Sequence, residues 1–230
     1  MLSRRTLIGT SLITAAGVVS GCALEGGPSD AEVAQFEREQ AAEMKAKTEQ
    51  KRIEEGEKKI LVAFFSRAGE NYAAGATEWI EEGHTKVMAG FIQDKLECDS
   101  FELKAKKAYP EGYDDCCDRA LKEQEDDKRP KISGKVIDVA DYHYIFLGCP
   151  IWWGAEPQII RTFLEKCGDL AGKVIIPFVT HGGSGMGKVE ENIAGLASGA
   201  TVYTGFAVTG TEVEKSQEDI EQWVNDLHLR

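Results

Sequence analysis

The sequence has no excess of basic residues. Its 230 residues include 27 Lys and Arg against 39 Asp and Glu, which gives a formal net charge of −12 at pH 7. Proteins that bind nucleic acid neutralise phosphates with basic patches, so this balance argues against nucleic acid as a partner. It also disfavours electrostatic docking on anionic lipid, so any attachment to a membrane needs another device.

Cysteine motifs for redox or metal chemistry are also missing. None of the six cysteines forms a Cys-x-x-Cys pair. Cys116 and Cys117 are adjacent, where a disulfide would be strained, and the acidic residues around them lack the spacing of metal ligands. Cys98, Cys149 and Cys167 lie in apolar stretches and are expected in the core. No Ser-His-Asp or Cys-His arrangement can be argued, so the sequence predicts no catalytic acid, base or nucleophile and no metal site.

The first 21 residues predict a signal peptide and not a transmembrane helix. Arg4 and Arg5 precede an apolar run over residues 7–19, which is too short to span a bilayer. The arginine pair resembles a twin-arginine export signal. Residues 19–22, Val-Ser-Gly-Cys, resemble a bacterial lipobox, which would make Cys22 the lipidated first residue of the mature protein. We therefore expect a lipid anchor on the extracytoplasmic face of a bacterial cell membrane; an ordinary signal peptide is the alternative.

Residues 22–57 predict a charged spacer between the anchor and the folded domain. About half of the positions from 31 to 59 are charged and Phe36 is their only aromatic residue, so this segment cannot bury enough surface to fold alone. Its Ala, Glu, Lys and Gln content favours partial helix. A coiled coil is the alternative, although the apolar residues make a poor heptad. Residues 58–230 suit a single domain with a sizeable core.

That domain alternates apolar runs of strand length with helical patterns. The expected strands are residues 60–65, 101–103, 144–149, 173–179 and 201–208. Amphipathic spacing predicts helices between them and after the last, where Ser216 and Asp219 suggest a capping box. Repeated strand and helix indicates an α/β fold, a parallel sheet covered on both faces. Five strands fit the doubly wound order 2-1-3-4-5.

Three loops follow predicted strands and therefore meet at one edge of the sheet, where open α/β folds bind ligands. The first begins Ser66-Arg67-Ala68-Gly69 and leads towards a helix near His84 and Thr85. Hydroxyls, small residues and backbone N–H groups beside a helix start suit a phosphate. The loop has neither a Walker motif nor Gly-x-Gly-x-x-Gly, which disfavours ATP and pyrophosphate cofactors. An ordinary strand-to-helix turn is the alternative.

The other two loops suit a flat ring. Residues 150–154 are Pro-Ile-Trp-Trp-Gly, and two tryptophans directly after a strand end are not both expected in the core. Residues 180–187, from Thr180 to Gly187, contain four glycines that allow close backbone approach and offer amides as donors. We expect the amides of Gly182 and Gly183 to face the ring. His181 is expected either to hydrogen-bond the ligand or to face solvent.

These segments resemble the short bacterial flavodoxin-like family. The resemblance is carried by residues 60–69, 146–154 and 176–185 and covers most of 58–230. It implies a five-stranded flavodoxin-like domain that binds FMN non-covalently. The implied phosphate site comprises Ser66, Ala68, His84 and Thr85, with Arg67 beside them. The implied ring site lies between Pro150, Ile151, Trp152, Trp153 and Gly154 on one side and Thr180, His181, Gly182, Gly183 and Gly185 on the other. Trp152 is the preferred stacking ring and Trp153 the second choice.

The chain departs from the family pattern at residues 70–83, which separate the Ser66 loop from His84. This insert is expected either to cover the flavin edge or to pack on the surface. Its carboxylates would not help to bind phosphate, so Lys86 or Arg67 is expected to offset them.

Two function classes remain open from the sequence. One is a membrane-tethered FMN protein that carries electrons to a redox partner or reduces a small acceptor such as a quinone. The other is a lipoprotein binding module with the same fold and no flavin. The chain has no separate nicotinamide fingerprint, which favours a carrier or a partner-dependent reductase.

Overall fold

The computed structural model describes residues 31, 34–44, 58–73 and 75–229. The chain divides into two units, residues 1–50 and 51–230. In the first unit, residues 34–44 are helical and their side chains are mostly exposed. The export signal and Cys22 lie outside the described residues. Among the helices that the structure describes, none is long and apolar enough to cross a membrane.

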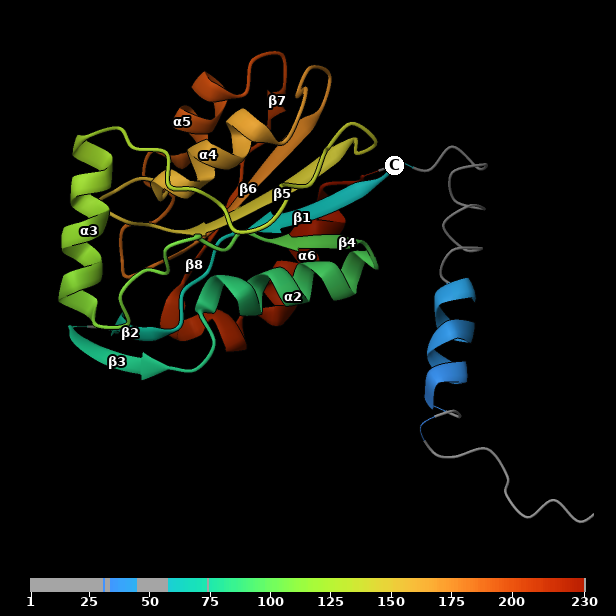
Figure 1. The fold of residues 1–230 in the computed structure, drawn as a ribbon, viewed down its shortest axis with the longest axis horizontal. Coiled ribbons are helices and arrows are strands. Elements are labelled where there is room, and N and C mark those ends of the chain that lie inside the picture. Colours follow the sequence, from blue (N-terminus) through green and yellow to red (C-terminus); the bar gives the residue numbers. More distant parts are fainter. Residues whose placement is uncertain (1–30, 32–33, 45–57, 74, 230) are drawn as a thin grey trace, which may run out of the picture. The chain divides into compact units, whose positions relative to one another are not determined.

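The second unit is built on a parallel sheet (Figure 1). Its strands are β1 (Ile60–Phe64), β4 (Asp99–Glu102), β5 (Tyr144–Pro150), β6 (Val174–His181), β7 (Thr201–Val202) and β8 (Phe206–Thr209). Their order is β4-β1-β5-β6-β7, and β8 also pairs with β6. With β7 and β8 taken as two parts of one strand, this is the predicted order 2-1-3-4-5, and the α/β fold class is confirmed.

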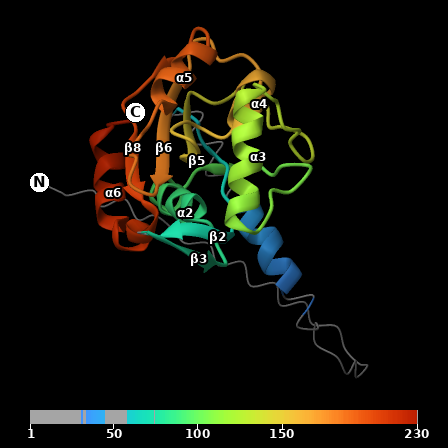
Figure 2. The ribbon, with the colours of Figure 1, turned by 90° about the vertical axis from the view of Figure 1, so that its left-hand side faces the viewer.

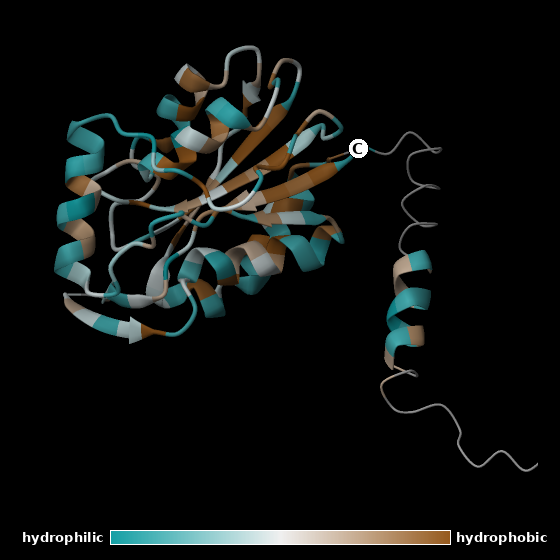
Figure 3. Cartoon of the chain, viewed as in Figure 1, coloured by the Kyte–Doolittle hydropathy of each residue, from teal (hydrophilic) through white to brown (hydrophobic). Residues whose placement is uncertain are grey.

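Strands β1 and β5 contain no charged residue because helices cover both faces of the sheet. Every residue of β1 is buried, as is all of β5 except Pro150. In Figure 3 these strands form a hydrophobic band through the middle of the domain, whereas the surfaces of the surrounding helices are mixed.

The helices divide between the two faces (Figures 1 and 2). They are α2 (His84–Leu96), α3 (Tyr113–Glu125), α4 (Gln158–Lys166), α5 (Val189–Leu196), the 3-10 helix η1 (Gly210–Lys215) and α6 (Gln217–Asp226). One face packs on α2, η1 and α6, through side chains such as Met88 and Ile220. The other packs on α4 and α5, through side chains such as Phe163 and Ile193, with Cys116 of α3 at its border.

The last strand is divided where a single strand was predicted. Ile175 pairs with Val202 and Phe178 with Phe206, so β7 and β8 contain one more residue than the facing part of β6. Between these pairs lies Pro177, which has no N–H to donate to the ladder. Residues 203–205 belong to neither β7 nor β8, so the strand is interrupted beside Pro177.

The insert forms a hairpin that the sequence did not predict. Strands β2 (Gly69–Ala73) and β3 (Ala76–Ile80) pair antiparallel, with Gly69 opposite Ile80 and Tyr72 opposite Thr77. The hairpin is separate from the main sheet and packs beside α3. It lies at the end of the sheet where the parallel strands finish.

Two local predictions have different outcomes. The Ser216 hydroxyl donates to the carbonyl of Glu212 (2.9 Å) and α6 has no side-chain cap, so the predicted capping box is wrong. Cys149 and Cys167 are buried as expected, whereas Cys98 is only partly buried against the core, and no two of the five described cysteines form a disulfide.

Candidate functional site

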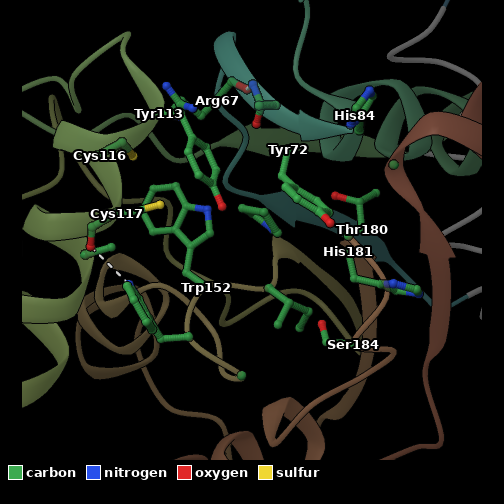
Figure 4. A pocket seen from close by; sticks show the side chains of 18 of the residues that line it. Arg67, Tyr72, His84, Tyr113, Cys116, Cys117, Trp152, Thr180, His181 and Ser184 are labelled. Atoms are coloured by element: carbon green, nitrogen blue, oxygen red, sulfur yellow. Dashed lines mark hydrogen bonds between the residues drawn. The ribbon is translucent and has the colours of Figure 1, made fainter. Parts of the chain in front are cut away.

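A cavity of about 750 Å³ lies at the carboxyl ends of β1, β5 and β6 (Figure 4). Loops after these strands form its floor, and the hairpin, α3 and the start of α2 surround it. Its lining consists of Arg67, Asn71, Tyr72, His84, Tyr113, Asp114, Cys116, Cys117, Asp118, Ala120, Pro150, Ile151, Trp152, Trp153, Gly154, Thr180, His181, Gly182, Ser184 and Gly210. A volume of this size suits a drug-sized or cofactor-sized ligand.

The cavity brings together two thirds of the residues that the sequence predicted. The predicted residues in its lining are Arg67, His84, Pro150, Ile151, Trp152, Trp153, Gly154, Thr180, His181 and Gly182. The predicted residues outside it are Ser66, Ala68, Thr85, Gly183 and Gly185. The convergence follows from the parallel sheet, which brings the ends of neighbouring strands to one edge. Which of these residues contact a ligand stays a prediction.

The two tryptophans have different environments. Trp152 is half-buried and packs edge-on against Phe65 (ring centroids 5.4 Å apart) and Tyr109 (4.9 Å). Trp153 is 54% exposed, and its indole N–H donates to the carbonyl of Cys117 on α3 (3.0 Å). Trp152 is therefore held rigidly at the cavity floor, as a stacking ring requires, whereas Trp153 ties its loop to α3.

The glycine loop is also held in place by its own contacts. The amide of Gly183 donates to Nδ1 of His181 (2.9 Å), so this amide has an acceptor within its own loop. Because Nδ1 accepts this bond, His181 is neutral with its proton on Nε2. Burial lowers the pKa of His181, which favours the same neutral form. Gly182 lines the cavity and packs against the ring of Tyr72.

The start of α2 offers donors for an anion. The Ser66 hydroxyl accepts the amide of Lys86 (3.1 Å), and the Thr85 hydroxyl is buried in a hydrogen bond with that of Thr180 (2.7 Å). Within the described residues, no acceptor meets the amides of His84 or Thr85. The first turn contains no acidic residue. Unpaired amides at the positive end of a helix dipole suit a phosphate.

The imidazole of His84 packs on Gly210, where a Cβ would lie 2.4 Å from Nδ1. Burial is the main cause that lowers the pKa of His84, and the carboxylates of Glu214 and Glu78 oppose it. The side chain is therefore mainly neutral at pH 7, so the anion-binding character of this corner comes from the backbone.

Arg67 does not offer a free cation to the cavity. Its guanidinium donates to the carbonyls of Pro110 (2.8 Å), Glu111 (3.0 Å) and Glu70. Lys86 instead pairs with Glu82 (2.6 Å), so one carboxylate of the insert is offset as expected. Arg67 serves to fasten the hairpin to the segment before α3.

The wall formed by α3 was not predicted. It contributes Tyr113, Cys117 and Asp118 to the cavity, and Tyr113 stands next to Trp152 in Figure 4. Burial, and then hydrogen bonding with Cys117, raise the pKa of Tyr113 to about 12, so its hydroxyl remains protonated at neutral pH. The local sequence reads as a charged surface helix, and only the tertiary fold turns one side of it towards the cavity.

Comparison with protein families agrees with this architecture. A family model described as Flavodoxin matches residues 59–227. The chain belongs to the flavodoxin family. The match covers the whole α/β domain, from the start of β1 to the end of α6.

Three solved structures similar to this flavodoxin-family chain are informative. A candidate flavoprotein from Bacteroides uniformis is 30% identical over 74% of this chain and 99% of its own, with a TM-score of 0.59. A flavoprotein from Lactobacillus acidophilus in complex with FMN is 25% identical over 69% and 97%, with a TM-score of 0.51. A candidate flavoprotein from Bacteroides eggerthii is 26% identical over 71% and 98%, with a TM-score of 0.54. A search of curated proteins found no match.

The cavity of this flavodoxin-family protein is aromatic and acidic. Asp114 and Asp118 are its charged residues on α3, and Arg67, the only lysine or arginine in the described lining, is engaged by carbonyls. Among the residues that the structure describes, no group of three His, Cys, Asp or Glu could hold a metal ion. Flat aromatic rings and backbone amides in one cavity suit the binding of an organic cofactor.

Proposed function

We propose that the protein binds FMN non-covalently and serves as a redox protein, either an electron carrier or a reductase of a small acceptor. The observation that carries the proposal is the cavity itself, which joins an aromatic floor at residues 150–154 to unpaired amides at the start of α2. One end suits a flat ring and the other a phosphate, as FMN requires. The similar flavoprotein from Lactobacillus acidophilus, solved in complex with FMN, supports the assignment.

Each part of the chain then has a distinct task. The amides of His84 and Thr85 bind the phosphate, while Ser66 orders the first turn of α2 by accepting the amide of Lys86. Trp152 stacks on the flavin ring and is fixed in place by T-shaped contacts with Phe65 and Tyr109. FMN, when bound, supplies the electron-transfer chemistry. The protein supplies binding, orientation and exclusion of water from the ring.

The charge of the cavity favours a neutral acceptor such as a quinone, or a protein partner, over an anionic nicotinamide nucleotide. Asp114 and Asp118 line the cavity and no uncommitted lysine or arginine among the described lining residues offsets them. We therefore expect little oxidation of NADH or NADPH by the purified protein alone. Reduced protein should transfer electrons to a neutral quinone faster than to its sulfonated analogue, with the difference shrinking as salt increases.

The direct test is purification of the domain, residues 58–230, and of the full chain. A flavin absorption spectrum, with release of FMN and not FAD on denaturation, is the expected result. If the isolated protein is colourless, the fluorescence of added FMN should be quenched on binding, and FMN should raise the melting temperature of the protein. A protein that FMN neither binds nor stabilises refutes the proposal and leaves the alternative, a binding module with this fold and no flavin.

We also propose that the protein is exported and lipid-anchored. The support is sequence alone: the Arg4-Arg5 pair, the apolar run over residues 7–19 and Cys22. A twin-arginine route would carry the folded domain with its cofactor already bound. Cys22→Ser should release the protein from the membrane fraction and prevent incorporation of labelled fatty acid, whereas Cys98→Ser should change neither.

A further inference from the structure

The loops after β5 and β6, which both line the cavity, contact each other through their main chains. The amide of Ile151 donates to the carbonyl of Thr180 (2.9 Å), and the amide of Lys188 donates to the carbonyl of Gly154 (2.9 Å). Gly187, with φ +57°, allows this approach, because a Cβ there would lie 2.4 Å from the Gly154 oxygen. The separation of the two loops therefore depends on how the segments that follow them are held together.

A buried carboxylate joins the segments that follow these loops. Glu156 lies just before α4, and its side chain is fully buried. One carboxylate oxygen accepts the Nε–H of Arg161 on α4 (2.9 Å), and the other accepts the side-chain amide of Asn192 on α5 (2.8 Å). Helix α4 follows the first loop, α5 follows the second, and the two helices pack side by side (Figure 1). The bond between Glu156 and Asn192 therefore links the two loops from behind.

The same network extends to α3, the third wall of the cavity. Arg161 lies 3.5 Å from the carboxylate of Asp127, which follows α3, and Arg129 pairs with Asp127 (2.8 Å) and with Glu165 of α4 (2.5 Å). Solvent screens these outer ion pairs, because Asp127 and Glu165 are largely exposed. The bonds of the buried Glu156 are not screened in this way, so they are the strong part of the network.

Stability alone does not account for a carboxylate at this position. Removing a charge from water is costly, and replacing a buried ion pair by apolar residues of similar volume is often neutral or stabilising. Apolar packing is non-directional, whereas hydrogen bonds to a carboxylate fix the distance and direction of both partners. Glu156 therefore sets a geometry between α4 and α5 that apolar packing would leave adjustable.

We propose that Glu156 is a positioning residue that fixes the separation of the loops after β5 and β6, and thereby the width of the ring site. The inference rests on the proposed function where it concerns the flavin, whereas the link between the loops is present without it. When the link is lost, only a fraction of the molecules has the loops at the binding separation, and the apparent affinity for the ring falls by that fraction.

The link can be tested by disruption and rescue. Asn192→Asp sets two carboxylates against each other and should weaken the binding of FMN and of riboflavin about three- to tenfold. Adding Glu156→Gln places an amide donor opposite the new carboxylate, and its oxygen still accepts Arg161, so the Kd should return to within about twofold of wild type. Asn192→Ala removes the bond without adding a charge and should weaken binding in the same direction. Each Kd is measured by flavin fluorescence titration.

Lys173→Met is the matched control. Lys173 is also buried and donates to the carbonyls of Ala140 (2.9 Å) and Tyr142 (2.8 Å), but it lies at the amino end of β6, away from the cavity. Its loss should lower the melting temperature of the FMN-free protein and leave the Kd for FMN unchanged. A role of Glu156 in stability alone would make the Asn192 variants behave in the same way as this control.

Hydrogen exchange separates this inference from the proposed function, because it needs no FMN. In the FMN-free protein, Asn192→Asp should speed exchange of the Ile151 and Lys188 amides relative to the amides of β1, and adding Glu156→Gln should slow it again. A wild-type protein that binds no FMN overturns the proposed function, and the exchange rates still decide whether the link exists. Unchanged exchange of both amides in Asn192→Asp and Asn192→Ala, or a double variant that restores neither exchange nor affinity, overturns the positioning role of Glu156.

Discussion

Replacing His84 by proline should remove one phosphate-binding amide without disturbing the helix. His84 is the first residue of α2, and Gly83 before it has φ −69° and ψ 138°. That extended backbone is the conformation a residue before proline prefers. Proline is well tolerated at the first helical position, because the amide there has no acceptor within the helix. His84→Ala is the matched control, since it also loses the imidazole but keeps the N–H.

The expected magnitude follows from the charge of the ligand. A hydrogen bond to a charged group contributes about 1.5–3 kcal/mol, and 1.4 kcal/mol corresponds to a factor of ten in affinity. FMN should therefore bind His84→Pro about ten to a hundred times more weakly than His84→Ala. Riboflavin has no phosphate and should bind both variants equally.

Fluorescence titration at constant ionic strength gives the Kd of FMN and of riboflavin for each of the two variants, and these four values test the prediction. Melting temperatures of the two FMN-free variants verify that proline has not disrupted α2. Equal FMN affinity of two folded variants would show that the amide of residue 84 does not hold the phosphate. The assignment of the phosphate to the His84 amide would then be refuted, whatever the ring site does.

Three other perturbations have defined outcomes. Trp152→Ala removes a half-buried ring from an aromatic cluster and should lower the free energy of unfolding by about 3 kcal/mol in denaturant titrations, as well as weakening FMN binding; a loss of stability without a loss of affinity would exclude it as the stacking ring. Gly148→Ala places a Cβ 2.1 Å from the ring of the fully buried Phe178. It should lower the free energy of unfolding by about 2 kcal/mol or more, measured by chemical denaturation. Because the pKa of His181 is lowered in the folded state, the unfolded chain takes up a proton first as pH falls, so the FMN-free protein should lose stability below about pH 6.5, and His181→Asn should reduce this dependence.

The parts of the fold that the sequence predicted are those with a local signature. Apart from Lys173, the runs at residues 60–65, 144–149 and 173–179 contain no charged residue because both of their faces are buried, and each proved to be a central strand. The division of the last strand had no such signature. It arises opposite Pro177, in the neighbouring strand, and pairing between strands cannot be derived from either segment alone.

For the site too, the sequence predicted only the parts that have a local pattern. The loops after β5 and β6 were assigned to it because the topology places strand ends together. The contributions of Tyr72 and Tyr113 were not, since residues 69–80 lack the alternating pattern of a strand and 113–118 have the composition of a surface helix. Both tyrosines reach the cavity through long-range contacts, such as that between Glu70 and the amide of Tyr113.

The residues that flank the hairpin on either side, Ser66 and Gly83, are in contact. Gly83 is packed against Ser66, where a Cβ would lie 2.2 Å from its hydroxyl oxygen, and Ser66 binds the amide of Lys86 just beyond. Residues 67–82 therefore form an insertion that begins and ends at the same place in the fold, since Ser66 and Gly83 are in contact. Such an insertion can be shortened, lengthened or exchanged while Ser66 and the start of α2 keep their arrangement. A change within residues 67–82 would therefore leave the contact between Ser66 and the start of α2 in place.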